Sequence, residues 1–188
     1  MVRRVGDQIL PLIGPAPHRP DVLVAIGDTH GTDDARLSGT AREAVRDAER
    51  VIHTGDFTTT SVLDAFERTA TDLAAVYGNN DGTAVRDRLP ATRVVDALDR
   101  RFVVAHGHEH DETSLSLLAR QEGADVAVVG HSHDPGIDVV GAVPVVNPGS
   151  HADPRWHRPG YAVFEAENGS VRVRLRTPDG ETFATGTV

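Results

Sequence analysis

The sequence predicts a two-sheet α/β sandwich with helices on the outside. Strand and helix signals alternate from Asp21 to Val129, and a run of strand signals without helices follows from Ile137 onward. The chain has 188 residues, of which 39% are hydrophobic, enough for one globular domain with a sizeable core. We therefore expect a single domain over residues 1–188.

The elements begin after an unusual N-terminal stretch. Residues 1–20 are rich in proline and glycine, so we interpret them as an extension on the surface, with a short strand at Gln8–Ile13. The next segment, Val22–Gly27, is a continuous apolar run, typical of a strand buried on both faces. Asp33–Arg50 carries apolar residues at helical spacing and predicts a helix.

The remaining elements follow the same logic. Further helices are expected over Thr60–Ala70 and Glu112–Glu122. Further strands are expected, in chain order, over Arg50–His53, Leu73–Tyr77, Val94–Ala97, Arg101–Ala105, Asp125–Val129, Ile137–Val140, Val143–Val146, Tyr161–Glu165 and Val171–Arg176. The dipeptide Asn168-Gly169 between the last two strands predicts a hairpin turn, because both residues tolerate positive φ.

Composition excludes several classes of protein. The net charge of -9 argues against general nucleic-acid binding, which needs a basic surface. The absence of cysteine excludes disulfides and thiolate zinc sites. The apolar runs are far shorter than the roughly 20 residues that a bilayer span needs, so no membrane partner is expected. Residues 1–10 lack the apolar core of a signal peptide, which predicts a cytoplasmic protein. The oligomeric state stays open, homo-oligomers included.

Five short polar motifs stand out along the chain. Four directly follow predicted strands and the fifth lies in a loop; they span Gly27–Gly31, Thr54–Phe57, Tyr77–Asp81, Ala105–His108 and Gly130–His133. The carboxyl ends of strands are where open α/β sheets bind ligands. We therefore expect the five motifs to meet at one site.

The residue types in these motifs indicate metal binding. The candidate ligands are Asp28, His30, Asp56, Asn79, His106, His131 and His133. Within the pairs Asp28/His30 and His131/His133 the members are two apart, so in an extended segment they project to the same side. Imidazole, carboxylate and amide oxygen without thiolate suit Mn, Fe, Co, Ni or Zn. Seven ligands are too many for one tetrahedral ion but suit two ions.

Two ions require a shared ligand, and Asp56 is expected to bridge them because a carboxylate has two oxygens. One ion would take Asp28, His30, Asp56 and His133, and the other Asp56, Asn79, His106 and His131. Two divalent ions, two carboxylates and a bridging hydroxide leave a net charge of about +1, which favours a phosphate. The expected reaction is hydrolysis of a phosphoester P–O bond by the hydroxide shared between two metals.

Other polar residues receive weaker interpretations. Structural roles are assigned to His18, His53 and His157, and surface positions near the motifs to His110 and His151. His108 either supports a ligand or faces solvent. Asp81 either caps the following helix or hydrogen-bonds a ligand.

The ordered motifs resemble those of the calcineurin-like metallophosphoesterases, which run Asp-x-His, Gly-Asp, Gly-Asn-His/Asn, a lone His and Gly-His-x-His. The versions at Gly78–Asp81, His106–His108 and Asn147–Ser150 are similar to the small prokaryotic phosphodiesterase subgroup. The resemblance covers about Asp21 to Glu165. It implies a four-layer αββα sandwich of two mixed sheets flanked by helices, with the seven ligands above and Asp56 as the bridge.

The resemblance also implies an activity. It is hydrolysis of a small phosphodiester with two divalent metal ions, Mn first, and Ni, Fe, Co or Zn as alternatives. One alternative is a phosphomonoesterase or phosphatase of the same fold. Another is a non-catalytic metal-binding scaffold, like the retromer subunit that shares this fold. Many family members carry a histidine where this chain has Asn80, which can donate a hydrogen bond but is no general acid. Catalytic roles are assigned to Asn80, which would orient the phosphate, and to His108, which is one of two sources for the leaving-group proton, the other being water.

Overall fold

The structure is a computed structural model that describes residues 4–5, 8–9 and 21–188. Two short strands, β1 (Arg4–Val5) and β2 (Gln8–Ile9), pair with each other in antiparallel fashion. The strand expected at Gln8–Ile13 is therefore present in its first two residues. Its remainder, and the surface position expected for the extension, lie outside the described residues.

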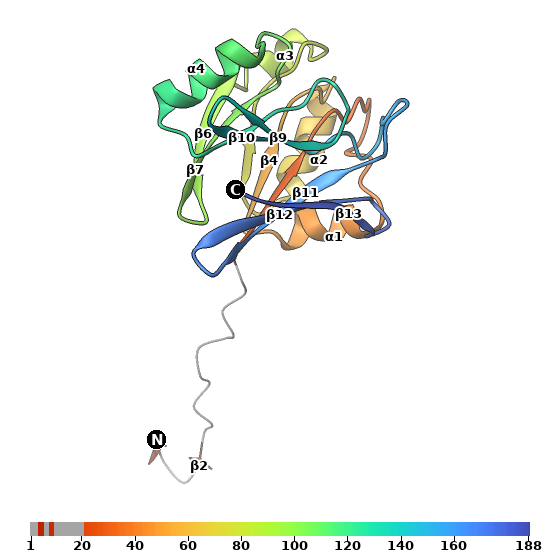
Figure 1. The fold of residues 1–188 in the computed structure, drawn as a ribbon. Coiled ribbons are helices and arrows are strands. Elements are labelled where there is room, and N and C mark those ends of the chain that lie inside the picture. The colour runs from red at the N-terminus through yellow and green to blue at the C-terminus, as the bar shows by residue number, and fades with distance from the viewer. Residues whose placement is uncertain (1–3, 6–7, 10–20) are drawn as a thin grey trace.

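One sheet has six strands and is mixed (Figure 1). Its order is β13 (Thr182–Thr187), β12 (Ser170–Arg176), β11 (Tyr161–Glu167), β3 (Val22–Ile26), β4 (Arg50–His53) and β5 (Leu73–Ala75). β3, β4 and β5 are parallel, whereas β11, β12 and β13 continue from β3 in antiparallel pairs. The parallel strands bring their carboxyl ends to one edge of this sheet.

The other sheet has five strands and is also mixed. Its order is β6 (Thr92–Ala97), β7 (Arg100–Ala105), β8 (Val126–Val128), β10 (Val143–Asn147) and β9 (Gly136–Val140). β7, β8 and β10 are parallel, and β6 and β9 close the edges as antiparallel partners.

The alternation of side chains along the strands builds the layers. In β3, Leu23 and Ala25 pack in the core shared with Phe102 of the other sheet, whereas Val24 and Ile26 face the helices. Four of the five β3 residues, Leu23 to Ile26, are buried, which explains why the run is continuously apolar.

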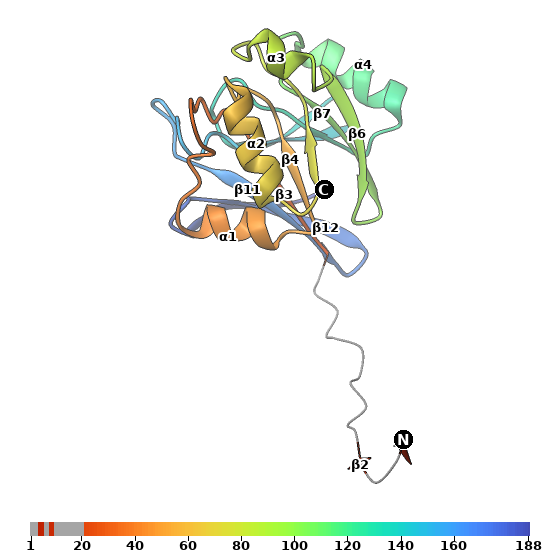
Figure 2. The same cartoon turned by 180° about the vertical axis from the view of Figure 1, so that it is seen from behind.

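Helices cover the outer faces of both sheets. They are α1 (Gly39–Asp47), α2 (Thr60–Thr69), α3 (Thr83–Arg86) and α4 (Glu112–Glu122). Figure 2 shows α1 and α2 against the six-stranded sheet. Both helices bury apolar side chains in a hydrophobic cluster on the outer face of that sheet. α4 packs Leu115 and Ala119 on the five-stranded sheet. The expected four-layer αββα sandwich of two mixed sheets is confirmed.

Several boundaries differ from the expectation. The helix expected over Asp33–Arg50 is confined to α1, because Ser38 is extended, Gly39 has a φ of +49°, and Arg50 pairs with Leu23 in the sheet. The strand β13 was not predicted, and the helix expected after Asp81 without stated bounds is the short α3. The hairpin turn is confirmed: Asn168 and Gly169 have φ values of +53° and +82°.

Among the described residues, no helix combines the length and apolar character that crossing a membrane requires. Cytoplasmic location stays a prediction.

Candidate metal centre

The motifs meet where the parallel strands of both sheets end. Asp28 and His30 follow β3, Asp56 follows β4, and His106 follows β7 directly. Backbone hydrogen bonds join these loops: the Asp28 N–H donates to Gly55 O at 3.0 Å, and the His30 N–H donates to Asp56 O at 3.0 Å. These bonds join the Gly27–Gly31 and Thr54–Phe57 motifs, and the Gly130 N–H, which donates to His106 O at 3.0 Å, joins the Ala105–His108 and Gly130–His133 motifs.

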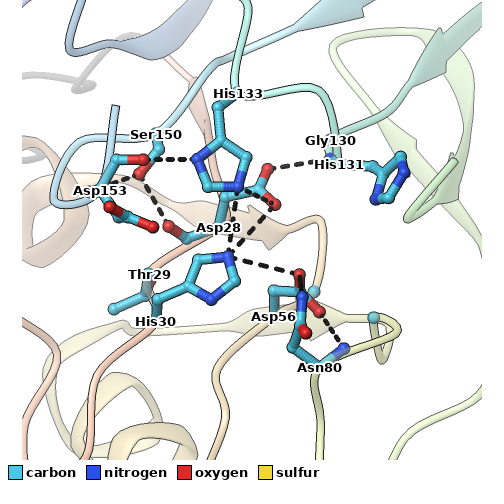
Figure 3. Close-up of polar contacts among 12 residues, drawn as sticks. Asp28, Thr29, His30, Asp56, Asn80, Gly130, His131, His133, Ser150 and Asp153 are labelled. Atoms are coloured by element: carbon cyan, nitrogen blue, oxygen red, sulfur yellow. Dashed lines mark hydrogen bonds and ion pairs between the residues drawn. The ribbon is translucent and has the colours of Figure 1, made fainter. Parts of the chain in front are cut away.

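One group of side chains surrounds His133. The Nε2 atoms of His30 and His133 are 3.2 Å apart. Asp28 Oδ1 lies 3.4 Å from His133 Nε2 and 4.0 Å from His30 Nε2 (Figure 3). Three ligand atoms from two distant segments thus lie within 4.8 Å of one another, close enough to hold one ion.

A second group surrounds His106 and includes Asp56. Asp56 Oδ2 lies 3.3 Å from His106 Nε2 and 3.4 Å from His30 Nε2, so one oxygen stands between the two groups. Asn79 Oδ1 is 3.0 Å from His106 Nε2, and the His131 ring lies 5.2 Å from the His106 ring. All seven candidate ligands therefore belong to one cluster.

The backbone reaches this arrangement by an unexpected route. The spacing argument assumed extended segments, but Asp28, His30, Asp56, His131 and His133 all have left-handed φ values, between +46° and +70°. The assumed conformation is therefore wrong, although both members of each pair join the cluster. A left-handed residue with a side chain costs roughly 1–2 kcal/mol, which the hydrogen bonds between the loops help to offset.

Two histidines are oriented for metal binding by their other ring nitrogen. His106 Nδ1–H donates to Thr54 O at 2.8 Å, and His133 Nδ1–H donates to Asp153 O. Burial acts to lower the His106 pKa, but the hydrogen bond with Asp56 and the charges of Asp28 and Asp56 outweigh it and raise that pKa. Since a carbonyl oxygen can only accept, the proton of each ring in its neutral form is on Nδ1, and Nε2 then has its lone pair facing the cluster. This is the tautomer that a divalent ion requires.

The pKa values of the two carboxyl groups, Asp28 and Asp56, are shifted in opposite directions. Asp28 is fully buried; its Oδ2 accepts the His131 N–H at 3.0 Å, but its Oδ1 has no hydrogen-bond partner among the described residues. Burial raises the Asp28 pKa to about 7. Burial also acts to raise the Asp56 pKa, but hydrogen bonds with His106 and Asn80 outweigh it and hold that pKa below its usual value. An orphaned buried carboxylate oxygen 3.4 Å from His133 Nε2 fits a bound cation.

The two residues assigned catalytic roles lie beside this cluster. The Asn80 backbone N–H donates to Asp56 Oδ1 at 2.8 Å, and its side-chain amide donates to Asp56 Oδ2 at 2.7 Å. The His108 ring is 5.3 Å from the His106 ring and 6.1 Å from the His131 ring. Burial lowers the His108 pKa, and its buried Nδ1 has no partner within the described part of the chain.

One side of the ligand cluster is buried and the other, called the open side below, is exposed to solvent. Asp28, Asp56, His106 and His133 are buried. Asn79, Asn80 and His131 are exposed, and His30 and His108 are half-buried. A ligand can therefore reach the cluster from the side of Asn80 and His131.

Comparison with known proteins identifies the family. The profile of the calcineurin-like phosphoesterase superfamily domain matches residues 22–169. The chain belongs to this superfamily. The resemblance seen in the motifs is confirmed, and membership supports phosphoester hydrolysis with divalent metals.

Two relatives of this calcineurin-like phosphoesterase by sequence are prokaryotic proteins, and one similar solved structure is from a eukaryote. A probable metallophosphoesterase of Bacillus subtilis is 34% identical over 159 residues, or 81% of this chain and 89% of the relative. A phosphodiesterase of Methanocaldococcus jannaschii is 31% identical over 112 residues, or 54% of this chain and 66% of the relative. The crystal structure of Vps29 complexed with Zn²⁺ from Entamoeba histolytica shares the fold, with a TM-score of 0.70, 22% identity and coverage of 89% and 98%.

His53 supports the phosphoesterase site in a way that its sequence did not reveal. The ring is fully buried at the end of β4. Its Nδ1 accepts the Gly55 N–H at 3.1 Å, so Nε2–H donates to Thr29 Oγ1 at 2.9 Å. Burial holds the His53 pKa well below its usual value, so the ring stays neutral. His53 is structural, as expected, but the structure it supports is the pair of loops that carry Asp28, His30 and Asp56. Its place two residues before Gly55 was the available signal.

Asp81 joins the loop after β5 to the loop after β4. Its carboxylate accepts the N–H groups of Asp56 at 3.0 Å, Gly78 at 2.7 Å and Thr58 at 2.7 Å. Of the two interpretations, bonding to a ligand is right, although through the backbone of Asp56. The helix-cap interpretation is wrong, because Gly82 occupies the N-cap of α3.

The remaining histidines are also placed. A surface position for His151 is wrong: the ring is buried and Nε2–H donates to Ala35 O at 3.1 Å. His110 is half-buried. His157 Nδ1 lies 3.1 Å from Asp134 Oδ1. His18 lies outside the described residues.

Proposed function

We propose that this chain is a phosphodiesterase that holds two divalent ions and hydrolyses a small phosphodiester. The observation that carries the proposal is the position of Asp56 Oδ2, at 3.4 Å from His30 Nε2 and 3.3 Å from His106 Nε2. A carboxylate between two imidazole groups is suited to being shared by two ions. The relative in M. jannaschii that is called a phosphodiesterase supports the choice of reaction.

The ligands divide between the two ions on either side of Asp56. Asp28, His30 and His133 would hold one ion, Mn first and Ni, Fe, Co or Zn as alternatives. Asn79, His106 and His131 would hold the other. When bound, such ions activate water and neutralise the charge that develops on phosphorus oxygens. His53, Asp81 and the Asp153 carbonyl keep the ligand atoms in place.

The open side of the cluster carries the groups that act on the substrate. Asn80 lies there with its amide on Asp56 Oδ2, and we propose that the amide turns to a phosphate oxygen when substrate enters. Its backbone N–H would keep Asp56 oriented. Either His108, half-buried beside the His106 and His131 rings, or water would deliver the proton to the leaving oxygen.

Turnover of matched substrates tests the proposal. The full chain, stripped with a chelator and reloaded with Mn, should have a higher kcat/KM on an aryl phosphodiester than on the corresponding monoester. Asp56→Asn should lose more activity than the roughly 10–100-fold typical for a residue that only supports a ligand. Asp64→Asn, the same change at a surface ion pair, should keep wild-type activity. Absence of turnover with every divalent ion would contradict the proposal that this chain is an enzyme. A higher kcat/KM on the monoester would favour the phosphatase alternative.

The scaffold alternative needs a separate criterion. Vps29 of E. histolytica shares the fold and has been crystallised with zinc, so bound metal alone does not distinguish a scaffold from an enzyme. Turnover that disappears with a chelator and returns with metal does distinguish them. A scaffold would bind the ions without it.

A further inference from the structure

The loop from Ser150 to Gly160, between β10 and β11, is fastened to the metal centre. Ser150 Oγ donates to the Asp28 carbonyl at 2.7 Å and accepts the Asp153 N–H at 2.8 Å. The Asp153 carbonyl in turn accepts His133 Nδ1–H, as Figure 3 shows. Both ends of this contact chain are candidate metal ligands. The position of the loop is therefore fixed relative to the cluster.

The same loop brings a free positive charge to the site. Arg155 is exposed and makes no hydrogen bond or ion pair with any described residue. Contacts on both sides of Arg155 hold it next to the Gly130–His133 motif. Two residues before it, the Asp153 carbonyl accepts His133 Nδ1–H, and two residues after it, His157 Nδ1 lies 3.1 Å from Oδ1 of Asp134, the neighbour of His133.

Two other arginines at the site are already engaged. Arg36 donates to the carbonyls of Thr29 and His30, and Arg86 donates to the carbonyls of Asn79 and Asp81. They stabilise the ligand-bearing loops. Arg155 donates to no other described residue, and a guanidinium fork suits phosphate oxygens.

An aromatic side chain stands next to this arginine. Trp156 is the only tryptophan of the chain, and 93% of its surface is exposed. The other exposed large hydrophobic residues among those described are aliphatic. Stacking on an exposed aromatic ring is how many proteins bind a nucleobase, and it stabilises binding by roughly 1–3 kcal/mol per base.

We propose that Arg155 and Trp156 form the substrate-recognition element of this site. Arg155 binds a non-bridging oxygen of the phosphate, and Trp156 stacks on a flat group esterified to it. The substrate class is therefore a phosphodiester of a single nucleoside. The net charge of -9 disfavours a long polyanion, which would need many cations along its path. The inference rests on the proposed phosphodiesterase function and specifies its substrate.

Binding can be measured without turnover because Trp156 is the only tryptophan. Its fluorescence in the zinc-loaded full chain should be quenched by adenosine 5′-monophosphate, and at the same concentrations not by ribose 5-phosphate, which lacks the base. Arg155→Gln should raise the half-saturating concentration of the nucleotide about 10-fold or more, as expected for loss of a charge-assisted hydrogen bond. Arg68→Gln, on the exposed face of α2, should leave it unchanged. Equal quenching by both phosphates, or no effect of Arg155→Gln, overturns the inference.

Kinetics separates this inference from the proposed function. Trp156→Ala should lower kcat/KM on a nucleoside aryl phosphodiester and on a methyl aryl phosphodiester by different factors. The loss on the nucleoside diester should be about 5-fold greater or more, because only that substrate carries a base to stack. If wild type hydrolyses both diesters and the variant loses equally on both, the recognition element is wrong and the phosphodiesterase stands. If neither is hydrolysed while nucleotide quenching still depends on Arg155, the catalytic proposal fails and nucleotide recognition is supported.

Discussion

The Nε2 atoms of His30 and His133 lie 3.2 Å apart, although 103 positions separate the two residues in the sequence. Because His133 Nδ1–H donates to Asp153, His133 Nε2 accepts the hydrogen bond and His30 Nε2–H donates it. An ion placed between the two rings would need both lone pairs. Metal binding therefore requires the His30 proton to leave Nε2, and the short contact marks where the ion would sit.

Gly78 is expected to be indispensable because any side chain there would collide with the proposed bridging carboxylate. A Cβ at this position would lie 2.1 Å from Asp56 Oδ1 and 2.7 Å from Asp56 N. Gly78→Ala should therefore displace Asp56, lower stability by about 1–3 kcal/mol and abolish metal-dependent turnover.

The matched control is Gly82→Ala, four residues further on. There a Cβ would meet only Thr58 O at 3.7 Å, and the φ of -67° suits alanine. Metal content and urea unfolding of both variants check the prediction. Similar behaviour of the two would mean that the contact with Asp56 is unimportant.

The sequence was informative about which residues meet and poor about how the backbone brings them there. The seven candidate ligands follow strand ends, so the parallel order of β3, β4 and β5 suffices to collect Asp28, Asp56 and Asn79. The left-handed backbone at Asp28 and His30 depends on hydrogen bonds to Gly55 and Asp56. Such contacts between distant segments leave no periodic signal in either one.

The supporting residues were missed for a related reason. Asp81 acts on the backbone of Asp56, 25 residues earlier in the chain, and its role depends on two loops folding against each other. His53 ends an apolar strand and has the local pattern of any core residue. The edge strand β13 (Thr182–Thr187) escaped because its few apolar residues are interrupted by threonine and glycine.

Asp81→Asn should weaken metal binding without touching a ligand. An amide can still accept from Gly78 and Asp56 through one oxygen, but its NH₂ group would face the Thr58 N–H, which now loses its acceptor. We expect a loss of about 1–3 kcal/mol in the free energy of unfolding and a roughly 10–100-fold weaker affinity for Mn. Calorimetric titration and urea unfolding measure the two quantities. Asp87→Asn, at an exposed position nearby, should change neither, and an unaltered Mn affinity in Asp81→Asn would contradict the role given to it.

Asn80→His should change the dependence on the leaving group. The new imidazole would stand beside Asp56, whose carboxylate favours the protonated ring, so it could act as a general acid. The kcat/KM for a diester with an alkyl leaving group should rise by up to roughly 10²-fold, the lower end of the range for general acid catalysis. The kcat/KM for a nitrophenyl diester should rise little. The slope of log kcat/KM against leaving-group pKa measures this, with Asn80→Gln as the variant that adds no acid. A parallel shift for all leaving groups would refute the assigned role.

Asp28→Asn should stabilise the metal-free protein at alkaline pH while destroying its metal site. Burial raises the Asp28 pKa from 3.8 to about 7, so the folded state keeps a proton that the unfolded state releases. The stability of metal-free wild type should therefore fall as the pH rises from about 4 to about 7 and stay low above that. An asparagine has no proton to release, so the variant should unfold at higher urea than wild type near pH 8, and the gap should narrow near pH 4.

Asp56→Asn is the control for that experiment, and its effect should have the opposite sign. The Asp56 pKa is held below its usual value, so its ionised form stabilises the fold above about pH 4, and the variant should be the less stable protein at neutral pH. Added Mn should raise the unfolding midpoint of wild type and of neither variant, because binding to the folded state alone stabilises it. If Asp28→Asn were less stable than metal-free wild type at every pH, the buried carboxylate would be a structural group. The orphaned Oδ1 would then need an explanation other than a cation.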